Sequence, residues 1–208
     1  MKRQALRAAA LAASLAVANV LTGCAPLLVG GAVLGGTLMA TDRRTSGAQV
    51  EDQAIELKSM NRIRDVVGDR GHVSTTSYNR VVLITGEVQT EADKTAVEQA
   101  VQRVENVKST VNELEIMGPS SLTSRSNDAI LSSKVKASFV DAKDLFANSF
   151  KVTSERGTVY LMGRVTEREA NRATEVARSV SGVQKVVRLF EIITEQELAD
   201  MAPKAPAK

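Results

Sequence analysis

Two residues stand out as candidate nucleophile and base, Cys24 and His72, because each is the only residue of its type among 208. A catalytic triad needs a histidine held between a serine and an acid, and no motif here selects a serine to partner His72. One cysteine and one histidine cannot form a zinc cluster or an intrachain disulfide. The glycine pairs at 30–31 and 35–36 lack the following lysine of a phosphate-binding loop. The sequence therefore predicts no catalytic residues, no metal, no cofactor and no small-molecule substrate, with a strand-edge position for His72.

The position of Cys24 gives its thiol a different chemistry. A basic start (Lys2, Arg3, Arg7) precedes an apolar run from 8 to 21, which is the pattern of a secretory signal. The run ends in Leu21-Thr22-Gly23-Cys24, which looks like a bacterial lipobox. That resemblance implies a signal peptide over 1–23, cleavage before Cys24, and acylation of its thiol and new amino group. An ordinary signal peptide with a chance cysteine is the alternative.

Acylation at two positions implies firm attachment to a membrane, since a single acyl chain binds only reversibly. The residue after the cysteine is Ala25 and not aspartate. In lipoproteins of Gram-negative bacteria, that resemblance implies sorting to the outer membrane. The expected location is thus the periplasmic face of the outer membrane, with the chain held by its lipid.

A third candidate is a helix in the second half of the chain. At about 100° per residue, one side of this helix, which we expect to face the core, carries Leu131, Val135, Ser138 and Phe139. Ile130 and Lys134 fall on another side, one turn apart, and an exposed isoleucine beside lysines suits contact with anionic lipid. A helix with one surface isoleucine is the plain alternative. The predicted phospholipid-binding residues are Ile130, Leu131, Lys134 and Lys136.

These residues are positioned by a unit that occurs twice. The segment VLITGEV at 82–88 aligns with VYLMGRV at 159–165, so that Gly86 corresponds to Gly163. Further along, VENVKSTVNELEI at 104–116 aligns with VSGVQKVVRLFEI at 180–192. The offset is 77 residues before the turn and 76 after it, so the first copy has one extra turn residue, and the pattern indicates two copies of one structural unit.

Each copy predicts the order α-β-β-α-β. In the first, a helix begins near Asp52, two strands follow over 71–88 with a tight turn at 78–80, and a helix (91–104) precedes a last strand (107–116). The predicted class is α+β, with a three-stranded mixed sheet per unit and the helices on one face. The mid-strand glycines Gly86 and Gly163 suggest close approach of a helix backbone. The expected helix-facing residues are Val82, Ile84, Gly86, Val88, Val159, Leu161, Gly163 and Val165.

The opposite sheet face carries Leu83 and Thr85 in one unit, and Tyr160 and Met162 in the other. It is only half apolar, so we expect it to serve packing between the units. Gly118-Pro119-Ser120-Ser121 marks a short linker. The predicted boundaries are a signal peptide at 1–23, a tether at 24–51, a first domain at 52–117, a linker at 118–126, a second domain at 127–194 and a disordered tail at 195–208.

Charge differs between the two units. Residues 54–116 hold eight basic and ten acidic side chains, whereas residues 125–190 hold twelve basic and seven acidic, a surplus of five. A basic second unit suits an anionic surface. A solvated face with scattered lysine and arginine explains the charge equally well. Nucleic-acid binding is disfavoured by export and by an aromatic content of 3%.

Two units of this pattern, with the motifs SNDAILSSKVKASF and VYLMGRVTEREA and the segment TDRRTSGAQVEDQ, resemble the BON domain family. For a lipoprotein with two such domains the resemblance implies binding of anionic phospholipid and support of envelope integrity, without enzymatic activity. It also implies envelope assembly or division proteins as partners. The first unit departs from the pattern, with Glu105-Asn106-Val107 where the second has Ser181-Gly182-Val183. An adaptor for outer-membrane assembly or cell-wall remodelling machinery is the alternative function, and a periplasmic chaperone is a third that the lipobox disfavours.

The first testable prediction concerns Cys24. We expect the mature chain to begin at this residue and to carry acyl groups on its thiol and amino group. Mass spectrometry of the N-terminal peptide measures both features. An unmodified thiol, or a mature terminus elsewhere, would contradict the prediction.

Overall fold

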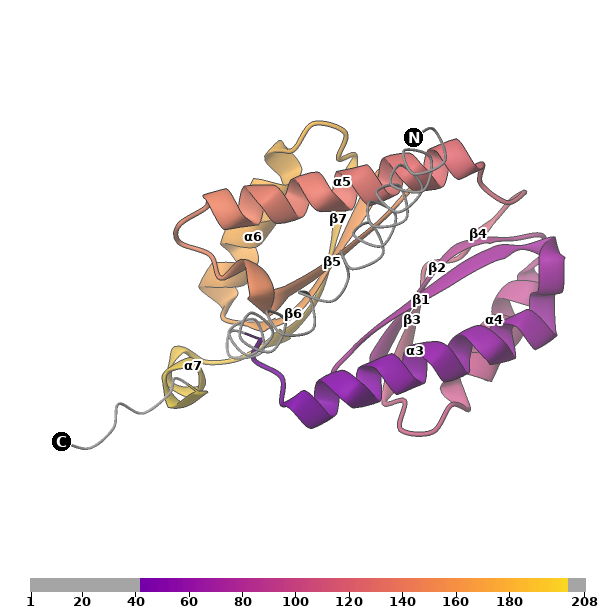
Figure 1. Ribbon diagram of the computed structural model, residues 1–208, viewed down its shortest axis with the longest axis horizontal. Coiled ribbons are helices and arrows are strands. Elements are labelled where there is room, and N and C mark those ends of the chain that lie inside the picture. Colours follow the sequence, from indigo (N-terminus) through magenta and orange to yellow (C-terminus); the bar gives the residue numbers. More distant parts are fainter. Residues whose placement is uncertain (1–41, 202–208) are drawn as a thin grey trace, which may run out of the picture. The chain divides into compact units, whose positions relative to one another are not determined.

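The computed structural model describes residues 42–201, so the signal peptide, Cys24 and the tether up to residue 41 lie outside the described residues, as do residues 202–208. Within the described part, two α+β domains follow one another along the chain (Figure 1). Among residues 42–201, no helix combines the length and the apolar character that a membrane span requires.

The first domain begins with the long helix α3 (Ser46–Val67) and a short 3₁₀ turn, η2 (Gly68–Arg70). Strands β1 (His72–Tyr78) and β2 (Val81–Val88) pair antiparallel. Helix α4 (Glu91–Gln102) leads to β3 (Ser109–Asn112) and β4 (Glu115–Ile116), which both pair parallel with β2. The predicted last strand is therefore broken in two, because the side chain of Asn112 accepts a bond from the backbone N–H of Leu114, whose side chain turns into the core.

The second domain repeats this order. Helix α5 (Leu122–Asp141) and the 3₁₀ turn η3 (Ala147–Ser149) precede β5 (Phe150–Glu155) and β6 (Thr158–Val165), which pair antiparallel. Helix α6 (Glu167–Ser179) then leads to β7 (Lys185–Ile192), which runs parallel to β6. The predicted α-β-β-α-β order and α+β class are confirmed. In Figure 1, α5 and α6 lie on one side of the sheet β5-β6-β7.

The hairpins and helix starts follow from local chemistry. Asn79 and Arg80 in one turn, and Arg156 and Gly157 in the other, all adopt positive φ. Two consecutive residues of this kind form a type I′ turn, whose twist matches that of the strands it joins. At the start of α6, Thr166 and Glu169 form a capping box, each side chain bonding the other's backbone N–H.

On each of the two sheets, the residues predicted to face the helices and those predicted to face away from them lie on the expected sides. One face packs under the helices and contributes Val82, Ile84 and Val88 in the first domain and Val159, Leu161 and Val165 in the second. The other faces of the two sheets meet and form a separate apolar cluster. We call this cluster the seam, and its buried members are Tyr78, Leu83, Tyr160 and Met162.

Three helix boundaries differ from the predictions. Helix α3 begins at Ser46 and not near Asp52, since Thr45 caps it by accepting the N–H of Ala48. Helix α5 begins at Leu122, capped by Ser121, within the stretch that was predicted to be a linker over 118–126. The tail predicted to be disordered from 195 forms α7 (Glu195–Met201), whose first turn is closed by reciprocal hydrogen bonds between Thr194 and Glu197.

The two mid-strand glycines lie close to backbone atoms, as expected, but these atoms do not belong to the α-helices that cover the sheets. A Cβ at Gly86 would lie 2.0 Å from the carbonyl oxygen of His72, and one at Gly163 would lie 2.5 Å from that of Ser149. The close neighbour of Gly86 is the first residue of β1, and that of Gly163 is the last residue of the 3₁₀ turn η3 just before β5, so neither contact is with an α-helix that packs on the sheet. Gly86 also has φ +113°, where a side chain adds backbone strain.

The second prediction follows from this contact. Gly86→Ala should lower the free energy of unfolding by at least about 2 kcal/mol, because strain and overlap both act on the folded state. Urea titration of the region 42–208, with an unchanged slope against urea, measures it. Gly118→Ala is the matched control, since a Cβ there meets nothing within 4 Å, and it should change stability by less than about 0.5 kcal/mol. Equal effects of the two substitutions would contradict the assignment.

Candidate functional site

Helix α5 divides its surface between the core and solvent. Leu131, Val135 and Phe139 are buried in the core of the second domain. The outer face presents Ile130 and Val140, whose exposed fractions are 53% and 69%. At 100° per residue these two lie on the same side of the helix, with the exposed Ala137 between them. The result is an apolar line along the outer face of a helix that is anchored to a rigid sheet.

Two lysines border this apolar line. Lys134 and Lys136 are both exposed, and their positions in the helix place them on opposite flanks of the line. Neither ammonium group forms an ion pair within residues 42–201. Their charges are therefore available to an external anion. We call the set Ile130, Lys134, Lys136, Ala137 and Val140 the outer α5 surface.

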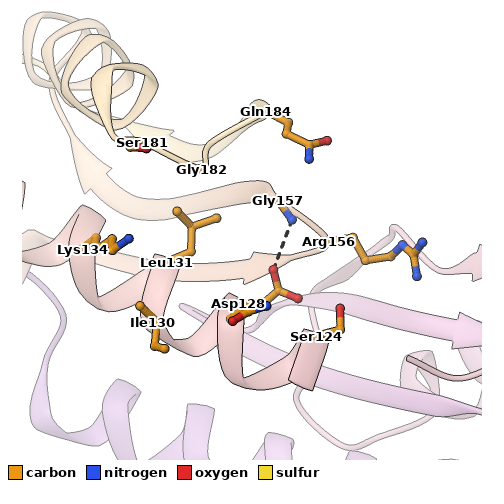
Figure 2. A pocket seen from close by; sticks show the side chains of 11 residues that line it. Ser124, Asp128, Ile130, Leu131, Lys134, Arg156, Gly157, Ser181, Gly182 and Gln184 are labelled. Carbon is orange, nitrogen blue, oxygen red and sulfur yellow. Dashed lines mark hydrogen bonds between the residues drawn. The ribbon is translucent and has the colours of Figure 1, made fainter. Parts of the chain in front are cut away.

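Leu131 does not belong to this surface. Its side chain is only 7% exposed and packs in the core. It forms instead the floor of a hollow of about 470 Å³ that Ile130 and Lys134 also border (Figure 2). The structure thus brings together three of the four predicted residues on the outside of α5 and places the fourth beneath them.

Two turns close the other side of the hollow. Gly157 lies in the β5–β6 turn and Gly182 in the turn after α6, with φ +76° and +101°. The first domain has Asn106 at the position of Gly182, and it also adopts positive φ. The sequence difference at this turn therefore preserves the backbone, since asparagine tolerates that conformation better than most residues.

Asp128 ties α5 to the β5–β6 turn. It is 8% exposed, and its Oδ1 accepts the backbone N–H of Gly157 at 3.2 Å (Figure 2). Arg156 beside it reaches Glu87 and Glu115, each at 3.5 Å. The neighbouring carboxyl of Glu155 is half-buried, and burial together with repulsion from Glu87 and Asp128 raises its pKa to about 7.

His72 lines a separate cavity with Arg125 and Glu155. Burial and the charge of Arg125 lower its pKa, against the opposite effect of Glu87. Across residues 42–201, no cluster of three or more His, Cys, Asp and Glu side chains is arranged to hold a metal ion.

Sequence reasoning missed two exposed apolar residues near this surface, Val140 and Phe146, which is 62% exposed in the loop after α5. Helix α5 carries apolar residues on both its inner and outer faces, so the pattern gives no single stripe that would separate them. The available signal was the spacing of Val140 from Ile130, because ten residues at 100° per residue place the two about 80° apart, both on the outer half of the helix.

Comparison with known proteins identifies both domains. The BON domain family matches residues 51–118 and again 127–194. The chain is 36% identical over 186 residues to the outer membrane lipoprotein DolP of Haemophilus influenzae, covering 88% of this chain and 95% of that protein. It is 27% identical over 154 residues to a 21 kDa hemolysin of Actinobacillus pleuropneumoniae, covering 73% and 79%. A solved structure of CdsD from Chlamydia trachomatis aligns with 71% of this chain and 99% of that one at 13% identity and a TM-score of 0.29, which is too low to support any argument.

The third prediction uses the pKa of Glu155. Its value of about 7 in the folded state exceeds the ordinary 4.5, so the folded state binds more protons between these values. The corresponding stability is fully present below about pH 4.5 and is lost as pH rises through 7. Glu155→Gln should therefore stabilise the region 42–208 relative to the parent at pH 8 and much less at pH 4.5. Urea titrations across this range measure the difference, and two parallel curves would contradict it.

Proposed function

We propose that this chain, which belongs to the BON domain family, is a non-enzymatic lipoprotein at the periplasmic face of the outer membrane that binds anionic phospholipid through its second BON domain and supports envelope integrity. The similar Haemophilus protein is described as an outer membrane lipoprotein, which supports the location. The lipobox ending at Cys24 supports the same anchor from the sequence. The partner is then the anionic surface of a membrane.

The outer α5 surface is the observation that carries the proposal. In a membrane surface the acyl chains lie below the phosphates. The apolar line of α5 can therefore contact the acyl chains while the two lysines that flank it bind phosphates. Near such a surface each well-placed basic residue contributes about 1 kcal/mol. A partly inserted isoleucine adds less than the roughly 1.5–3 kcal/mol of full burial. Because the two contributions are comparable, neither alone should give strong binding.

An exposed apolar stripe on α3 of the first domain supports a second candidate function. Three apolar side chains of α3, Val50, Leu57 and Met60, are 63%, 61% and 47% exposed and lie along one side of the helix. The domain around them carries two more acidic than basic residues over 54–116. An apolar stripe without a basic surround suits a protein partner better than an anionic lipid. This stripe supports the alternative of an adaptor for outer-membrane assembly, division or cell-wall remodelling proteins.

The fourth prediction tests the assignment to the second domain. Ile130→Glu combined with Lys134→Glu should nearly abolish flotation of the region 42–208 with vesicles that contain phosphatidylglycerol. The fold should survive, because both side chains point outward, and circular dichroism checks this. Binding by the parent should be absent on neutral phosphatidylcholine vesicles and should weaken with salt.

The matched control is Arg62→Glu with Arg64→Glu on α3. Both arginines are exposed, and the double reversal changes the net charge by more than the α5 pair does. Flotation should fall much less in this variant. If it falls as far as in the α5 variant, diffuse attraction between charges is the better account and the site on α5 is wrong.

A further inference from the structure

Arg43 precedes the first domain, but its side chain binds residues of the second domain that lie more than a hundred positions later in the sequence. Its guanidinium binds both carboxylate oxygens of Glu169 at 2.7 Å and donates to the carbonyl oxygen of Arg164 at 2.9 Å. The side chains of Arg43 and Glu169 are only 7% and 2% exposed. Glu169 is the residue whose carboxylate also accepts the N–H of Thr166 at the start of α6. Although burial acts to raise the pKa of Glu169, the bonds from Arg43 and Thr166 lower it.

Arg44, the next residue, is committed to the first domain. It binds Asp52 at 2.7 Å, with exposed fractions of 11% and 2%, and its guanidinium lies 4.2 Å from the ring centre of Tyr78. Asp52 in turn accepts the hydroxyl of Ser77 and the backbone N–H groups of Asn79 and Arg80. Asp52 thus holds the first hairpin, just as Glu169 holds the start of α6.

The contacts of the two arginines link the two domains across the seam, through Tyr78 and Arg164. The hydroxyl of Tyr78 in the first domain accepts the backbone N–H of Arg164 in the second at 3.1 Å, and the carbonyl of that same Arg164 accepts Arg43. Other ion pairs cross between the domains. Lys151 and Glu56 are 32% and 28% exposed, and Arg156, which is 39% exposed, lies 3.5 Å from the buried Glu87. In neither pair are both side chains buried, as they are in the pair of Arg43 with Glu169. Exposed pairs contribute little, whereas breaking a buried pair leaves an unpaired charge and costs far more.

We propose that residues 42–44 form a strap that couples the membrane tether to the seam between the two BON domains. Docked, the strap holds the two sheet faces together through Arg43 and Arg44. Released, it leaves the seam with its apolar cluster and the remaining polar contacts, without the buried ion pair of Arg43, so the seam opens while each domain stays folded. The tether over 24–41 joins the folded unit directly before the strap, so a pull on the anchor reaches Arg43 and Arg44 before any other contact of residues 42–201. This device does not depend on lipid binding by α5.

The experiment measures opening of the seam by thiol labelling in the full mature chain in detergent. Met162→Cys places a thiol in the seam, where the native side chain is 1% exposed, and Val135→Cys places one in the core of the second domain at 0%. Into each background we would introduce Arg43→Gln. Labelling at position 162 should accelerate at least tenfold, whereas labelling at position 135 should change less than twofold.

Two further variants sharpen the test. Glu169→Gln keeps an oxygen that can cap α6 but loses the ion pair, and should accelerate labelling at 162 as Arg43→Gln does. Arg172→Gln breaks an ion pair with Asp144 whose partners are 42% and 52% exposed on the same domain, and should leave both rates unchanged. Unchanged labelling at 162 in Arg43→Gln would overturn the strap. Equal acceleration at 162 and 135 would also overturn it, because Arg43 would then act only on the stability of the second domain.

Discussion

A three-stranded sheet with helices on one face has a second face that water would otherwise cover, and in this protein each sheet covers the other. The fully buried part of the seam consists of two tyrosines with Leu83 and Met162, and partly buried aliphatic side chains surround it. Tyrosines suit such a place because the ring is apolar and the hydroxyl can find a partner. Tyr78 finds the N–H of Arg164, and burial raises its pKa to about 12. A small domain buries too little surface to be very stable alone, so the seam supports both.

Buried carboxylates fix the ends of the elements that meet near the seam. Burial opposes ionisation of Asp52, yet the bonds it accepts from Ser77, Arg80, Asn79 and Arg44 lower its pKa. Such a carboxylate is stable only when every partner is present. The first hairpin therefore needs Arg44, which lies outside the segment matched by the BON domain at 51–118. The folded unit begins before the family pattern does, because its electrostatics require the residues upstream.

The parts of the fold that could be predicted are those determined by local patterns. Alternation in 159–165 identified the strand and both of its faces. What could not be predicted depends on contacts distant in sequence. Nothing around Arg43 indicates that it pairs with Glu169, 126 residues away. For α5, by contrast, helical spacing already separated Leu131, on the expected core side, from Ile130, which is exposed. Assigning Leu131 to the lipid contact as well was inconsistent with that spacing. The acylated cysteine and the lipid contact remain predictions.

The seam leaves the outer faces of the helices exposed. Because the seam occupies one side of each sheet, the helices on the other side keep their outer faces free. The outer α5 surface thus contributes little to either core, so its residues can be chosen for what they contact outside the chain. Asp42, where the tether joins the folded unit, lines a cavity of about 340 Å³ with Lys136 and Val140 of this surface. The first residue of the folded unit therefore lies beside the helix proposed to contact lipid, and attachment of the chain to the membrane raises the effective concentration of that helix at the bilayer. A weak contact of a few kcal/mol is then sufficient, since the anchor already supplies the association.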